Sequence, residues 1–130
     1  RYKRITSFLR KHGVDIIILD SDGNTEPLIP LIIEAGITCQ EPLEQAAGMD
    51  PRKIRREYGH DFALIGGIDK REIAKGKGAI EREVMSKIPD RVADGGYIPT
   101  LDHNVSPDIS YQNFLYYLKV KQQAMQQSRK

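Results

Sequence analysis

Polar residues that could carry chemistry follow each of four short apolar segments of the chain. Asp20 and Asp22 follow the first segment, Glu41 the second, Asp69 the third and His103 the fourth. Carboxylates and an imidazole can move protons near neutral pH or hold a divalent cation. In a parallel α/β protein, functional residues cluster where strands end and loops begin. The sequence therefore predicts one site, built from all four strand ends.

Asparagine and glycine residues extend this predicted site. Asn24 closely follows the first segment, and a pair of glycines follows the third. The residues that we assign to substrate binding are Asp20, Asn24, Glu41, Gly66 and Gly67. The alternative for the polar ones is turn formation or helix capping, and for the glycines close backbone packing.

Two of these carboxylates form a candidate metal-binding pair. Asp20 and Asp22 flank a single serine. Carboxylate ligands favour Mg²⁺, Ca²⁺ or Mn²⁺ over a thiolate-type zinc site. We therefore expect a divalent metal to be the candidate cofactor at Asp20 and Asp22, with the identity of any cofactor left open.

The apolar segments alternate with helical patterns. The predicted strands are Asp15–Leu19, Ile37–Gln40, Phe62–Ile65 and Tyr97–Leu101. The predicted helices are Arg1–His12, Thr25–Ala35, Pro51–Tyr58, Lys70–Lys75, Gly78–Ala93 and Ile109–Gln127. This alternation predicts an α/β fold with parallel strands and right-handed crossovers. Four strands cannot close a barrel, so the pattern leaves two alternatives, half of a (β/α)8 barrel or a small open sheet.

Composition excludes several classes of protein. The chain has 130 residues, which suits one domain or part of one, and its net charge of +2 with interspersed acids and bases gives no nucleic-acid footprint. Its apolar runs are too short to span a bilayer, and no signal peptide is visible. The single cysteine, Cys39, is consistent with a reducing cytoplasm. The chain starts inside a helical pattern without an initiator methionine, which we interpret as a sign of a fragment.

Five strings of residues resemble the C-terminal half of the uroporphyrinogen decarboxylase superfamily. They are DSDGN, PLIPLIIEAG, PLEQAAGMD, ALIGGIDKR and GGYIPTLDHNVSPD, and they span nearly the whole chain. The resemblance implies that residues 1–130 form the C-terminal half of a (β/α)8 TIM barrel, with the N-terminal half missing. It also implies an active site in a cleft at the carboxyl ends of the strands.

The motifs depart from both known branches of that superfamily. Where the zinc-dependent methyltransferases carry His-x-Cys-Gly, this chain has Asp20, Asp22 and Gly23, so thiol-activating zinc chemistry is not expected. The decarboxylases carry Gly-Asn-x-Asp-Pro and Gly-His-Gly in the third and fourth motifs. Asp69 and His103 match the aspartate and histidine of those motifs. The resemblance therefore implies catalytic roles for Asp69 and His103.

The resemblance implies an enzyme closer to the methyltransferase-like members than to the haem-pathway decarboxylase. The expected activity is methyl transfer involving a small acceptor and a corrinoid, which a partner protein would carry. The alternatives are a cytoplasmic tetrapyrrole decarboxylase, a lyase of porphyrin biosynthesis, and a non-catalytic half-barrel that binds a ligand. The expected partners are a small-molecule or tetrapyrrole substrate, a corrinoid protein and a second copy of the chain in a homodimer, without nucleic acid or membrane.

Overall fold

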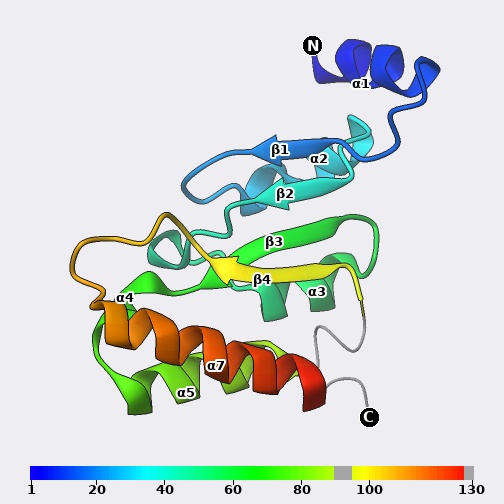
Figure 1. Ribbon diagram of the computed structural model, residues 1–130. Coiled ribbons are helices and arrows are strands. Elements are labelled where there is room, and N and C mark those ends of the chain that lie inside the picture. Colours follow the sequence, from blue (N-terminus) through cyan, green and yellow to red (C-terminus); the bar gives the residue numbers. More distant parts are fainter. Residues whose placement is uncertain (90–94, 128–130) are drawn as a thin grey trace.

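Four parallel strands form one sheet in the computed structural model, which describes residues 1–89 and 95–127 (Figure 1). The strands are β1 Ile18–Asp20, β2 Cys39–Glu41, β3 Ala63–Ile68 and β4 Tyr97–Leu101, and they lie side by side in chain order. An open doubly wound sheet reverses its strand order at a switch point, whereas a barrel wall does not. The predicted α/β class is confirmed, and the arrangement is compatible with half of a (β/α)8 barrel.

Helices connect the strands as parallel crossovers. The helical elements are α1 Tyr2–Lys11, η1 Glu26–Leu28, α2 Ile29–Glu34, η2 Gln45–Ala47, α3 Pro51–Tyr58, α4 Lys70–Ala74, α5 Lys77–Lys87 and α7 Tyr111–Gln127. Two aspartates start helices, because the Asp50 and Asp69 carboxylates accept hydrogen bonds from the first-turn backbone of α3 and α4. Within the described ranges, no helix is long and apolar enough to cross a membrane.

Several element boundaries differ from the predicted ones. Strand β1 begins at Ile18 instead of Asp15, and β2 begins at Cys39 instead of Ile37. The predicted helix 25–35 is split into η1 and α2, because Pro27 and Pro30 each remove a backbone donor. Strand β3 continues through Gly66 and Gly67 to Ile68, so the glycine pair is part of the strand and not of the loop. The predicted helix 78–93 ends as α5 at Lys87, and its last predicted residues, 90–93, lie outside the described ranges.

The helices cover one face of the sheet. The strand register places Leu19, Gln40, Leu64 and Tyr97 in one row across the four strands, and most of this row is buried. Apolar clusters form between that face and the helices, and a small one of Ile17, Ile32 and Ile37 lies near β1 and α2, while two others are larger. One contains Ile29, Leu43, Met49, Ile54, Phe62, Leu64 and Tyr97, and the other Ile68, Ile73, Ile80, Val84, Ile88, Leu101, Ile109, Tyr117, Val120 and Ala124.

Apolar side chains remain exposed on and beside the opposite face. Ile18 and Ile98 belong to β1 and β4 and are 47% and 55% exposed, and Ile16 just before β1 is 75% exposed. Ile65 of β3 lies in the same row as Ile98 and is half-buried. In a barrel this face would be the packed interior, because layers of branched side chains fill it. The sheet is therefore covered on one side and open on the other, as a piece of barrel wall is.

Candidate functional site

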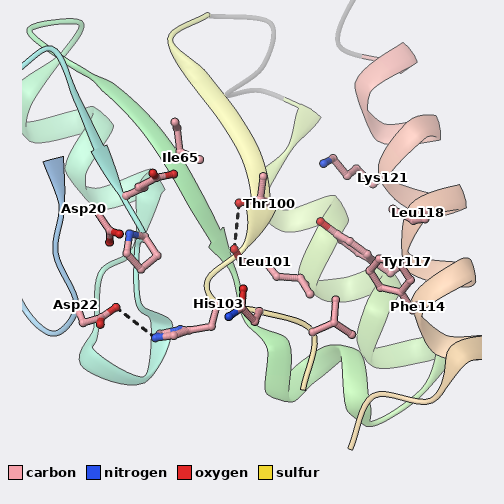
Figure 2. A pocket seen from close by; sticks show the side chains of 14 residues that line it. Asp20, Asp22, Ile65, Thr100, Leu101, His103, Phe114, Tyr117, Leu118 and Lys121 are labelled. Atoms are coloured by element: carbon pink, nitrogen blue, oxygen red, sulfur yellow. Dashed lines mark hydrogen bonds and ion pairs between the residues drawn. The ribbon is translucent and has the colours of Figure 1, made fainter. Parts of the chain in front are cut away.

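A cavity of about 640 Å³ lies at the carboxyl ends of the strands, on the open side of the sheet (Figure 2). It contains several of the predicted site residues together with residues of α7. The residues that line it are Asp20, Asp22, Glu41, Pro42, Ile65, Thr100, Leu101, His103, Asn104, Val105, Phe114, Tyr117, Leu118 and Lys121. Its size and its mixture of apolar walls and a few polar groups are typical of a small-molecule site.

One wall of the cavity is acidic. Asp20 and Glu41 end neighbouring strands and lie opposite each other in the register of β1 and β2. The side chain of Asp22 is 74% exposed and belongs to the loop that follows β1. Three carboxylates at one wall favour a ligand group that is cationic, or one that gives up a proton. The sequence prediction that Asp20, Asp22 and Glu41 share a site agrees with this placement.

His103 faces the acidic wall from the end of β4. Its Nε2 atom lies 3.5 Å from Oδ1 of Asp22, and the two side chains point toward each other in Figure 2. Its Nδ1 atom is buried without a hydrogen-bond partner among the described residues, and the nearest carboxylate oxygen of Asp102 is 4.0 Å away. The Nε2 atom of the imidazole therefore faces the cavity, whereas its Nδ1 atom is buried in the protein.

Glu44 joins this pair from the loop after β2. Ligand atoms of Asp22, Glu44 and His103 all lie within 4.8 Å of one another. The backbone N–H of Gly23 donates a 2.7 Å hydrogen bond to Oε2 of Glu44, which ties the β1 loop to the β2 loop. One imidazole and two carboxylates thus converge from three strand ends, and among the described residues they form the grouping suited to holding a metal ion.

Asp102 fixes the loops around this group. It is 1% exposed, and its two oxygens accept hydrogen bonds from the backbone N–H groups of Gln45, at 3.0 Å, and Lys70, at 3.1 Å. Gln45 belongs to the segment after β2, and Lys70 begins the helix after β3. The next residue is His103, so the histidine follows directly on the residue whose carboxylate binds the β2 and β3 segments. Asp102 is a positioning residue, since both of its oxygens are engaged away from the cavity.

The wall opposite the carboxylates comes from α7. Tyr117 is 2% exposed, and its hydroxyl has no hydrogen-bond partner among the described residues. Burial raises the pKa of this hydroxyl, so it stays protonated and can donate. Lys121 is half-buried, with its ammonium 6.0 Å from the centre of the Tyr117 ring, and burial lowers its pKa. These two groups provide a donor-rich wall, separated from the acidic wall by apolar side chains such as Phe114 and Leu118.

Asp69 does not line the cavity. Its side chain caps α4 through a 2.9 Å hydrogen bond from the Arg71 backbone, and the Arg71 guanidinium binds both of its oxygens. Burial acts to raise the pKa of Asp69, but the hydrogen bonds and charge of Arg71 outweigh it and hold that pKa below its usual value. A carboxylate so engaged stays ionised and acts as a helix cap, which is a different role from the acid–base one that the family resemblance implies.

Three other residues that we assigned to substrate binding also lie outside the cavity lining. Asn24 is exposed, and its side-chain oxygen accepts a hydrogen bond from the backbone of Glu26. Gly66 and Gly67 adopt φ of +105° and +82° in β3. A Cβ on Gly66 would lie 2.9 Å from the backbone nitrogen of Leu43, and one on Gly67 would lie 2.8 Å from the Pro51 ring. The two glycines thus permit close packing of neighbouring chain segments.

Sequence reasoning did not assign Glu44, Tyr117 or Lys121 to the site. Glu44 was visible as one of several acids after β2, but nothing in the sequence shows that its side chain turns toward His103. Tyr117 and Lys121 are four residues apart, one helical turn, which is also the spacing of ordinary core positions. Cys39 is 4% exposed in β2, and burial raises the pKa of its thiol. It is therefore an inert packing group that does not reach the cavity lining.

No protein-family model matches the chain, and no curated protein matches it.

Proposed function

We propose that this chain is the C-terminal half of a uroporphyrinogen decarboxylase-like (β/α)8 barrel. The complete enzyme would transfer a methyl group from a corrinoid to a small acceptor. The observation that carries the proposal is the cavity at the strand ends, where carboxylates and a histidine from β1, β2 and β4 meet. The strand order and the open apolar face support the barrel, and the motif strings support the superfamily. A corrinoid carried by a partner protein would supply the methyl group.

The residues of this chain would prepare the acceptor. An acceptor that carries an O–H, N–H or S–H group must lose that proton as it gains the methyl group. Asp20 and Glu41 are neighbours at the acidic wall and would take up the proton. Tyr117 and Lys121 would bind the opposite, electron-rich end of the acceptor, and the apolar residues between them would exclude water from it.

The acidic wall argues against the decarboxylase alternative. A tetrapyrrole substrate bears many carboxylate groups, and Asp20, Asp22 and Glu41 would repel them at the mouth of the cavity. A methyl acceptor does not need to carry carboxylates and would then not be repelled by this wall. The distribution of charge therefore favours methyl transfer.

Consumption of methylcobalamin tests the proposed activity. We expect the full-length protein to demethylate methylcobalamin in the presence of a small thiol, amine or phenol, monitored by the absorbance change of the corrinoid. Glu41→Gln should lower the rate about tenfold, because Asp20 remains as a second proton acceptor. Conversion of uroporphyrinogen together with stable methylcobalamin would instead establish the decarboxylase. Binding of the acceptor without any turnover would establish the non-catalytic alternative.

A further inference from the structure

The Lys121 amine can carry out chemistry that the proposed methyl transfer does not use. Its side chain is half-buried in the cavity wall, and no carboxylate among the described residues pairs with it. Lys87 is the contrasting case, since it is buried but its ammonium binds the Glu83 carboxylate at 2.5 Å. A paired ammonium keeps its proton, whereas burial without a partner favours the neutral amine and lowers the pKa of Lys121. The neutral amine is the nucleophilic form.

The Tyr117 hydroxyl lies in the same wall, one helical turn before Lys121. Its side chain is 2% exposed, and the hydroxyl has no hydrogen-bond partner among the residues that the structure describes. In Figure 2, Tyr117 and Lys121 both reach from α7 toward β4, where Thr100 lines the cavity. A buried hydroxyl without a partner is unfavourable, so a ligand atom that accepts its hydrogen bond would be stabilised. This hydroxyl stays protonated and is therefore a proton donor in the wall that holds the amine.

The rest of the cavity indicates what kind of molecule the amine would meet. Phe114 and Leu118 supply apolar surface on the same helix. Asp20 and Glu41 in the opposite wall disfavour a ligand that carries carboxylates of its own. A volume of about 640 Å³ suits a small organic molecule. The cavity therefore favours an uncharged molecule with an apolar body, and the amine would react with it at an electrophilic carbon.

We propose that Lys121 forms an imine with a small uncharged aldehyde or ketone in this cavity, and that the Tyr117 hydroxyl donates the protons. The amine nitrogen adds to the carbonyl carbon, and the carbonyl oxygen takes the Tyr117 proton to give a carbinolamine. The nitrogen then returns a proton to the Tyr117 oxygen. A second donation from Tyr117 releases the carbinolamine hydroxyl as water while the nitrogen lone pair forms the C=N bond.

The resulting iminium nitrogen gives its proton back to the Tyr117 oxygen, so the tyrosine ends as it began. One water is released for each imine, and nothing is oxidised or reduced. The reaction needs only the cavity and these two side chains of α7. It does not depend on the proposed methyl transfer.

Reductive trapping in the full-length protein tests this proposal. Benzaldehyde is the probe, because it is uncharged and apolar, and sodium cyanoborohydride converts its imines to stable benzylamines that peptide mass spectrometry locates. We expect Lys121 to be labelled at least about tenfold faster than Lys119, an exposed lysine of the same helix. Tyr117→Phe keeps the buried ring and should slow the labelling of Lys121 about tenfold. Tyr111→Phe, at an exposed tyrosine of α7, is the matched control and should change that rate by less than about twofold.

Labelling of Lys121 no faster than that of Lys119 would overturn the proposal. Selective labelling of Lys121 at the same rate in Tyr117→Phe as in the wild type would overturn the role of the hydroxyl. Thermal melts check that the variants are folded, and loss of a hydroxyl without a partner should not destabilise the protein. The methylcobalamin assay separates these failures from that of the proposed function. Methyl transfer with unselective labelling removes only the imine, and selective labelling without methyl transfer removes only the methyl-transfer activity.

Discussion

Replacing His103 by alanine in the full-length protein is expected to lower turnover on the order of 10²-fold while the protein stays folded. His103 directs Nε2 into the cavity at 3.5 Å from Asp22, so its loss removes a ligand from the metal group and a polar group from the site. The side chain is 28% exposed and its Nδ1 atom is buried, so its loss also removes some packing. The thermal midpoint should therefore change by only a few degrees. Turnover and thermal midpoint are measured on the same purified sample.

His60→Ala serves as the control for this prediction. His60 is an exposed histidine after α3, in the segment that leads into β3, and it lies outside the cavity lining. Its replacement should leave turnover per folded molecule unchanged. The site assignment of His103 would be wrong if His103→Ala kept full turnover per folded molecule and lowered only the thermal midpoint.

Replacing Lys87 by methionine is expected to destabilise the protein by about 3–5 kcal/mol. Lys87 is 5% exposed in the last turn of α5, and its ammonium binds Glu83 at 2.5 Å, Gln45 at 2.6 Å and the Gly67 carbonyl at 2.9 Å. Methionine fills the space of the aliphatic stem but leaves the Glu83 carboxylate, itself 11% exposed, without its partner. Breaking a buried pair from one side is costly because the remaining charge stays desolvated. Denaturant-induced unfolding measures the change.

Two further variants isolate the buried charge as the cause. Lys119 is an exposed lysine of α7, and Lys119→Met should change the free energy of unfolding by no more than about 0.5 kcal/mol. The double variant with Lys87→Met and Glu83→Leu should regain part of the lost stability, because no unpaired charge is then buried. A loss in Lys87→Met no larger than in Lys119→Met would show that the Lys87 network contributes little.

Local pattern predicted the elements well where helix caps and apolar runs coincide. Strand β4 and helix α3 have the predicted bounds, since Asp50 and Pro51 mark the helix start and the strand lies between a glycine pair and Asp102. The glycine pair misled the prediction of β3, because Gly66 and Gly67 usually end a strand. Here they continue it, with left-handed backbone that lets Leu43 and Pro51 approach closely. This close approach involves residues that are distant in the sequence, so the residues around Gly66 and Gly67 do not reveal it.

Part of the site could likewise be predicted from the local sequence, and part depends on contacts between residues that are distant in the sequence. Placing Asp20, Asp22, Glu41 and His103 at one edge needed only the rule that parallel strands end together. Asp69 sits at the same edge but is turned away, because Arg71 two residues later binds its carboxylate. Side-chain direction of this kind depends on neighbours in space. The contribution of α7 to the cavity depends on how that helix packs beside β4. The spacing of apolar residues predicts a helix but does not predict where the helix packs.

We propose that the open face of the sheet belongs to the interior of a larger barrel. Ile16, Ile18 and Ile98 expose apolar surface there, and β1 and β4 have unpaired edges in the described sheet. Exposed edges and apolar faces promote association. Ile18→Lys places a charge on this face and should reduce association of the isolated chain. Leu28→Lys, at an exposed leucine on η1, is the matched control and should not.

Sedimentation velocity of the isolated 130-residue chain is the most direct test of this claim. We expect dimers or larger species whose proportion rises with concentration, and which fall back toward monomer when the chain is mixed with an N-terminal half-barrel that completes it. A monodisperse monomer across the whole concentration range, with a cooperative thermal melt, would contradict the claim. The chain would then be a self-sufficient open α/β domain.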